Sequence, residues 1–144
     1  MGIKIIHNEY GGMMEIRMTI YTEAVAKGRP RVNFNNGKVH TFTPEKTMQA
    51  EYVIRQAIIE KGYNMPFSTD KPLRLYATFY ILKPKSVKRE YPVCRPDIDN
   101  YLKTVLDAGN HYLWNDDSQI VTILAAKRYS DTPRIELLLI GEKK

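Results

Sequence analysis

The segment Pro96–Gln119, PDIDNYLKTVLDAGNHYLWNDDSQ, carries five of the sixteen acidic residues of the chain and its only tryptophan. Its apolar residues recur at the spacing of one helix face: Ile98, Tyr101, Leu102, Val105 and Leu106. This spacing predicts an amphipathic helix whose apolar stripe faces a core. Asp99, Lys103 and Asp107 form a second row, at i, i+4 and i+8, on the flank of that stripe.

Two carboxylates lie at the expected start of this helix. Asp97 and Asp99 do not share a helix face, because residues i and i+2 point in different directions. If Asp97 instead has cap geometry, its carboxylate can turn toward Asp99. Each residue alone also has a structural interpretation, as a helix cap or as a partner of the helix dipole. The spacing of Asp99 and Lys103 fits a plain ion pair as well.

The acidic residues as a group exceed what a helix cap requires, because Asp116 and Asp117 follow downstream. Carboxylates brought together repel and raise each other's pKa unless a cation lies between them. Oxygen ligands without His or Cys favour a hard ion such as Mg²⁺, for which Mn²⁺ can substitute. We expect Trp114, beside the Asp pair, to be a core anchor that fixes this turn rather than a platform for base stacking.

Three short motifs follow one another along the segment: Asp97-x-Asp99-Asn100-x-x-Lys103, Asp107-Ala108 and Trp114-x-Asp116-Asp117-x-Gln119. Together they resemble the signature of the RusA-type Holliday-junction resolvases, a family common in phages and prophages. Weaker similarity extends upstream to KGRPR at residues 27–31 and TFTP at residues 41–44. The resemblance therefore covers most of the chain.

The resemblance implies a crossover junction endodeoxyribonuclease that uses Mg²⁺, acts as a homodimer and resolves four-way DNA junctions by paired symmetric cuts. By the same resemblance, the carboxylates that coordinate the ion are Asp97, Asp99 and Asp117, and the catalytic lysine is Lys103. Asp116 is expected just outside the metal ligands, and Asp107 at the helix surface or core edge. An ion so held can polarise the scissile phosphate and lower the pKa of a water molecule. Lys103, one turn from Asp99, can stabilise charge on the phosphate or orient the water.

The overall charge favours a polyanionic partner. The formal net charge is +6 and the pI is near 9.4, and two segments concentrate basic side chains. The residues predicted to contact nucleic acid are Arg29 and Arg31 in the first segment, and Lys85, Lys88, Arg89 and Arg95 in the second. Basic residues next to a carboxylate cluster offset the phosphate charge that the carboxylates repel. The alternative is a solvated hairpin face and a mobile surface loop.

The composition predicts one soluble domain. A chain of 144 residues that is 43% hydrophobic and 26% charged is long enough for a single core. Cys94 is the only cysteine, which excludes an intrachain disulfide and a cysteine metal cluster. No run of 18 apolar residues and no signal-peptide core is present, so we expect an intracellular, cytoplasmic protein.

The pattern of elements predicts an α+β (mixed α/β) fold, with a mixed sheet of about five strands and both main helices on one face. The expected strands and hairpin span 14–25, 32–42, 72–83, 120–130 and 134–140. A helix is expected from Pro44 to about Lys61, with a core stripe of Ala50, Val53, Ile54, Ala57 and Ile58 and an exposed Glu51–Arg55 pair. Residues 1–12 have little pattern and are expected to be a flexible leader, with Met13 or Met14 as an alternative start.

Two other functions fit the same residues. In one, the metal site is kept but the substrate is a flap, another branched DNA or an RNA. In the other, the carboxylates only cap and pair, and the chain is a catalytically silent protein that binds DNA junctions.

Overall fold

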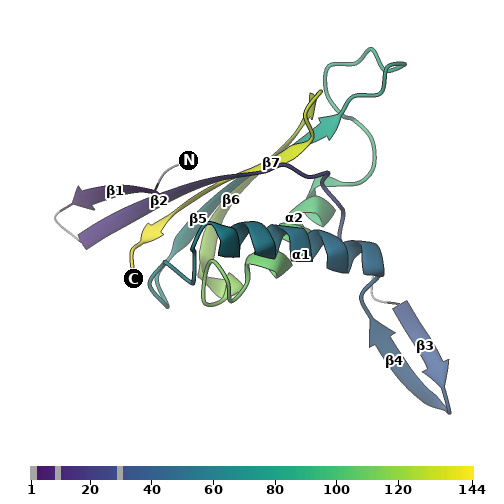
Figure 1. Cartoon of the computed structure of the whole chain (residues 1–144), viewed down its shortest axis with the longest axis horizontal. Helices are drawn as coiled ribbons and strands as arrows, with labels where there is room; N and C mark the ends of the chain where they lie inside the picture. Colours follow the sequence, from purple (N-terminus) through teal and green to yellow (C-terminus); the bar gives the residue numbers. More distant parts are fainter. Residues whose placement is uncertain (1–2, 9–10, 29–30) are drawn as a thin grey trace.

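The computed structural model describes residues 3–8, 11–28 and 31–144, and the side chains among them from residue 12 to 28 and from residue 32 onward. A five-stranded mixed sheet, in the order β1-β2-β7-β5-β6, forms the body, and a separate two-stranded hairpin projects from it (Figure 1). The elements are β1 (Ile3–Asn8), β2 (Gly11–Ile20), β3 (Arg31–Asn35), β4 (Lys38–Phe42), α1 (Glu45–Glu60), β5 (Leu73–Leu82), α2 (Ile98–Gly109), the 3₁₀ turn η1 (Asp117–Gln119), β6 (Ile120–Ser130) and β7 (Arg134–Glu142). None of the helices in the described part of the chain is long and apolar enough to span a membrane.

The sheet buries one face under both helices, as the alternating sequence pattern predicts (Figure 1). Alternate residues of β5 and β7 are buried on that face, among them Leu75, Phe79 and Leu139. Tyr101 of α2 stacks on Phe79 with ring centroids 5.4 Å apart. The predicted α+β class, mixed sheet and placement of the helices are therefore confirmed.

Strands β5 and β6 are parallel, whereas every other described strand pair is antiparallel. A parallel pair needs a crossover connection, and α2 supplies it. The chain leaves β5, passes through the basic segment 83–97 and enters α2 near the carboxyl ends of the parallel strands β5 and β6. This topology brings the basic segment and the acidic helix start to one end of the molecule (Figure 1).

Several sequence expectations need correction. The hairpin of β3 and β4 is not part of the main sheet, and the fifth strand of that sheet is β1, which lies within the expected leader and pairs antiparallel with β2. In α1 the buried residues are Thr47, Glu51, Ile54 and Ile58, whereas Val53 is exposed. The predicted pair of Glu51 and Arg55 is present, but its predicted exposure is wrong, because Glu51 is buried and is also ion-paired with Lys27.

Candidate active site

The first turn of α2 presents two carboxylates to solvent. Asp97 occupies the N-cap position with an extended backbone (φ −70°, ψ 149°), yet its side chain makes no capping hydrogen bond. Its backbone carbonyl accepts from the Asn100 N–H at 3.1 Å, so the helix start is formed without the carboxylate. Asp99 lies in the same turn and is exposed. Among the side chains that the structure describes, no basic residue is ion-paired with either carboxylate.

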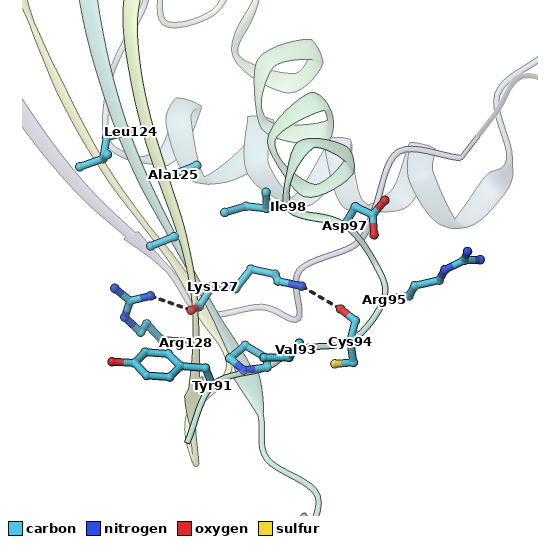
Figure 2. A pocket seen from close by; sticks show the side chains of 12 residues that line it. Tyr91, Val93, Cys94, Arg95, Asp97, Ile98, Leu124, Ala125, Lys127 and Arg128 are labelled. Atoms are coloured by element: carbon cyan, nitrogen blue, oxygen red, sulfur yellow. Dashed lines mark hydrogen bonds between the residues drawn. The ribbon is translucent and has the colours of Figure 1, made fainter. Parts of the chain in front are cut away.

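The segment that leads into Asp97 is held by a lysine of β6. The Lys127 Nζ donates to the backbone carbonyls of Cys94 at 2.8 Å and Pro96 at 3.1 Å. An open groove lies between this segment and β6, and Figure 2 shows the Asp97 carboxylate directed away from β6. Lys127 therefore fixes the approach to the helix through backbone carbonyls and not through the Asp97 carboxylate.

A second segment docks on the same helix turn from the other side. The Lys27 N–H donates to the Asn100 carbonyl at 2.8 Å, and the Gly28 N–H donates to the Thr47 hydroxyl at 3.0 Å. A Cβ at Gly28 would lie 2.8 Å from Cγ of Pro44, so only glycine permits this close approach to the start of α1. The first turn of α2 is thus bracketed by two anchored segments.

A partly buried ion network lies along the other half of α2. The Lys27 Nζ contacts Glu51 at 2.5 Å and Asp107 at 3.0 Å, and the Lys103 Nζ contacts Asp107 at 3.1 Å. Burial alone would raise the pKa of Asp107, but hydrogen bonds from Lys27 and Lys103 hold that pKa below its usual range. Burial likewise opposes the charge of Lys27, and its two carboxylate partners raise its pKa nonetheless.

Lys103 is therefore oriented by Asp107. Its pairing with Asp99, which the i, i+4 spacing also allows, is not among the ion pairs of the described side chains. Its side chain is still 59% exposed, so the ammonium group can reach a ligand in solvent. Asp107 is 25% exposed and joins the two lysines, which agrees with its expected place at the edge of the core.

Asp117 is held by the tryptophan that precedes it. The Trp114 Nε1 donates to the Asp117 carboxylate at 2.6 Å, and the indole itself is fully buried. The ring packs on Gly109, where a Cβ would lie 2.5 Å from Cη2 of Trp114. The prediction that Trp114 is a core anchor for this turn is confirmed. Burial raises the pKa of Asp117, and the nearby carboxylates of Asp107 and Asp116 raise it further.

Asp116 has a structural role in the same turn. Its side chain accepts from the Ser118 N–H at 3.1 Å, and the Gln119 side chain accepts from the Asp116 N–H at 3.1 Å, which completes a capping box. The hydrogen bond from Ser118 lowers the pKa of Asp116. Gln119 also donates to the carbonyls of Ser68 and Lys71, so it ties the turn to the loop before β5.

The structure does not bring the three predicted metal ligands into one cluster. Among the described residues, no three His, Cys, Asp or Glu side chains lie close enough to hold one metal ion together. Asp99 and Asp107 are about 12 Å apart along the helix axis, and Asp117 is bonded to Trp114, which packs on Gly109 at the end of the helix. Asp97 and Asp99 form an exposed group at the start of the helix, and Asp117 belongs to its far half.

The residues predicted to contact nucleic acid differ in their exposure and in their contacts. Lys85, Lys88 and Arg95 are exposed on the segment before α2. Arg89 is exposed too, but its Nε donates to the Tyr129 hydroxyl of β6 at 3.2 Å, and its guanidinium lies over that ring. Arg29 lies outside the described residues, and Arg31 is described only in its backbone.

Sequence reasoning missed two residues of this region. Lys27 was counted with the basic hairpin segment, although it reaches Glu51, 24 residues away, and no local pattern shows that contact. Lys127 had a visible signal: it follows Ile123 and Ala125 in strand alternation, so it falls on the helix-covered side of β6. In the structure it pairs in register with the buried Phe79.

Comparison with known proteins shows the family whose motifs the sequence resembles. Residues 22–139, more than half of the chain, match the family model of the endodeoxyribonuclease RusA. The chain is 36% identical over 136 residues to an uncharacterized protein of Bacillus subtilis (strain 168), YqaN, and this match covers 86% of the chain and 94% of that protein. It is 32% identical over 88 residues to the crossover junction endodeoxyribonuclease RusA of Lactococcus phage r1t, a match that covers 60% of the chain and 67% of the phage protein. The chain belongs to the RusA endodeoxyribonuclease family.

Proposed function

We propose that this protein is a Mg²⁺-dependent endodeoxyribonuclease that resolves four-way DNA junctions by paired symmetric cuts. The observation that carries the proposal is the state of Asp97 and Asp99. One occupies a cap position without capping, and both stand in solvent with no ion-pair partner among the described side chains. Carboxylates that the fold does not use are available to a ligand, and the family supplies a phosphodiester substrate.

The donor set fits a hard cation. Mg²⁺ needs only one or two carboxylates, because waters and substrate phosphates complete its octahedron. Asp97 and Asp99 meet this requirement. We assign the metal to Asp97 and Asp99, with Mn²⁺ as a substitute. The family motif adds Asp117 as the third ligand, and this role requires its turn to approach the helix start when the ion binds, because the structure holds the three carboxylates apart. The bound ion would polarise the scissile phosphate and lower the pKa of the attacking water.

The remaining residues hold and orient the substrate. Lys103 offers an exposed ammonium group that Asp107 aims, and it is placed to stabilise negative charge that develops on the phosphate. Lys127 fixes the carbonyls that precede Asp97, so the first carboxylate is positioned before DNA arrives. The basic residues predicted on the two flanking segments bind the DNA backbone: Arg29, Arg31, Lys85, Lys88, Arg89 and Arg95.

A four-way junction has approximate two-fold symmetry, so two symmetric cuts call for two copies of the site related by a two-fold axis. We therefore propose a homodimer that works in the cytoplasm. Edge strand β6 carries exposed apolar side chains that suit an interface between copies, and these are Val121, Ile123 and Leu124.

The test is cleavage of a synthetic immobile four-way junction, with linear duplex of the same sequence as the control. Wild type and Asp97→Asn are compared in Mg²⁺ and in EDTA. Paired nicks that require both the metal and Asp97 support the proposal. Junction binding without cutting in any divalent metal contradicts it and favours a silent junction-binding protein. Equal cutting of flaps, RNA hybrids or linear duplex keeps the metal site and rejects the junction as its substrate.

A further inference from the structure

The hairpin of β3 and β4 carries an apolar face that nothing in the described chain covers. The two strands pair only with each other, with Phe34 opposite Val39 and Val32 opposite Thr41. Because opposite residues of an antiparallel pair share a face, Val32, Phe34 and Val39 lie on one side of the ribbon. Their exposed fractions are 56%, 76% and 61%. We call this side the apolar face of the arm.

The charges of the arm point to nucleic acid. From Lys27 to Pro44 the sequence contains basic residues but no Asp or Glu. The face opposite the apolar one includes Lys38 and His40, and β4 is exposed throughout. A second copy of the chain fits this ribbon poorly, since a two-fold contact would place each basic arm against its own like-charged copy. A nucleic acid carries negative charge and flat apolar bases, so it complements both the basic residues and the apolar side chains of the arm.

The arm is anchored beside the candidate active site. Its incoming strand follows the segment in which Lys27 and Gly28 bond to the first turn of α2 and to α1, and its outgoing strand leads directly into α1. A strand of five residues extends about 17 Å. The ribbon projects from the body at the end of the molecule where α2 begins (Figure 1). DNA with a phosphate at Asp97 and Asp99 therefore lies within reach of the arm.

We propose that this arm enters branched DNA at the crossover, where Phe34 stacks on an unpaired base and the basic face of the ribbon contacts the flanking phosphates. The proposal rests on the proposed junction substrate and extends it to a residue for structure selectivity. An isolated two-stranded ribbon is marginally stable in water, and an uncovered apolar face adds to that cost. Bases at a branch point are more easily unstacked than those of continuous duplex, and aromatic side chains bind them through their faces.

The experiment measures binding and base unstacking in the Asp97→Asn background, so that the junction is not cut. Junction affinity is measured by fluorescence anisotropy, and a 2-aminopurine at the branch point reports unstacking. Phe34→Ala is expected to weaken junction binding about tenfold, which corresponds to ~1.4 kcal/mol, and to abolish the fluorescence change. Phe34→Trp is expected to retain both, and binding to linear duplex is expected to stay the same. Tyr52→Ala, at an exposed aromatic of α1, is the matched control with no expected effect.

Each outcome decides one question. A Phe34→Ala protein that binds and unstacks the junction as its parent does would overturn the arm assignment alone. Loss of the dimer in Phe34→Ala, measured by sedimentation equilibrium, would overturn it in favour of contact between copies. Cleavage is not read in this experiment, so wild-type protein that binds junctions selectively but cuts none of them in Mg²⁺ contradicts the proposed nuclease activity and leaves the arm assignment intact. Circular dichroism of Phe34→Ala is expected to match that of the parent, since the side chain is exposed.

Discussion

The two ends of α2 use the same residue type in opposite ways. At the start, Asp97 and Asp99 are exposed, and the helix cap is formed without them. At the far end, Asp107 is ion-paired to two lysines, and Asp117 accepts a hydrogen bond from a buried tryptophan. The fold pairs one group of carboxylates with its own donors and leaves the other group without a partner among the described side chains.

This difference shows why partners matter more than residue type in assigning a site. A carboxylate bound by protein donors has most of its lone pairs already satisfied, whereas an exposed one keeps them for water, a metal or a substrate. The exposed group at the helix start also lies between two anchored basic segments, where phosphate is electrostatically favoured. Substitutions in the two groups should therefore have opposite consequences for activity and stability.

The largest effect is expected from Asp99→Asn, at the start of the helix. Cleavage of a four-way junction should fall at least about a hundredfold, because the proposed metal ligand and its charge are lost. The free energy of unfolding should change by less than about 0.5 kcal/mol, since the carboxylate makes no described contact. Junction cleavage and urea unfolding measure the two quantities. Asp131→Asn, in the exposed β6–β7 turn, is the control; if Asp99→Asn unfolds more easily while still cutting, the distinction between the two ends is wrong.

The next largest effect is expected from Lys27→Met, which removes two ion pairs from the network along the far half of α2. The change leaves the buried Glu51 with only Arg55 and removes one partner of Asp107. Breaking a buried pair costs 3–5 kcal/mol, and the partial exposure of these groups reduces our expectation to about 2 kcal/mol. Urea unfolding gives the value, and Lys46→Met, at an exposed lysine of α1, should change it little. Adding Glu51→Gln should recover part of the loss, and an absence of recovery would contradict the network.

The sequence predicted what local period and turn chemistry determine. The apolar stripe of residues 98–106 predicted the helix that the structure shows as α2, and the hairpin expected at residues 32–42 is formed by β3 and β4. Trp114 was assigned correctly because a lone tryptophan beside a polar turn needs a core to bury its ring. In each case the signal lies within a few residues of the feature.

What the sequence could not show depends on contacts between distant segments. Glu51 falls among polar positions of α1, and it is buried only because Lys27 reaches it from another segment. Strand β1 has no regular alternation and is defined by its pairing with β2. The motif also groups Asp117 with Asp97 and Asp99, although the fold bonds it to Trp114, which packs on the end of α2. Spacing along a chain does not report which turn of a helix a downstream loop will contact.

A third, smaller effect is expected from Asp107→Asn, and it depends on pH. The folded pKa of Asp107 lies below 3.8, so its charge stabilises the fold above that pH, and this contribution is lost as the pH falls through the folded pKa. The variant should lose about 1 kcal/mol of unfolding free energy at pH 7, an estimate lowered for partial exposure. The difference from wild type should disappear in strong acid. Urea unfolding from pH 2 to 7 measures it, and a difference that persists at pH 2 would contradict the ion pairs.

The smallest effect is expected from Asp117→Asn, and its sign is reversed. Burial and two neighbouring carboxylates raise the pKa of Asp117, so the folded state holds this proton more tightly than the unfolded chain. Stability contributed by the protonated form is therefore lost as the pH rises from 3.8 through the folded pKa. Asparagine is uncharged at every pH, so the variant does not lose this stability. The variant should melt slightly higher than wild type at pH 7 and equally at acid pH, because an amide oxygen still accepts from Trp114.

The adjacent Asp116 supplies the matched control for this last change. Asp116→Asn weakens a charged capping bond to Ser118, so it should lower the melting temperature where Asp117→Asn raises it. Mg²⁺ adds a second measurement, because a ligand that binds only the folded state raises the melting temperature. Mg²⁺ should stabilise wild type and Asp116→Asn more than Asp117→Asn. Equal stabilisation of all three would restrict the metal to the start of α2, and Asp117 would then serve only the turn that holds it.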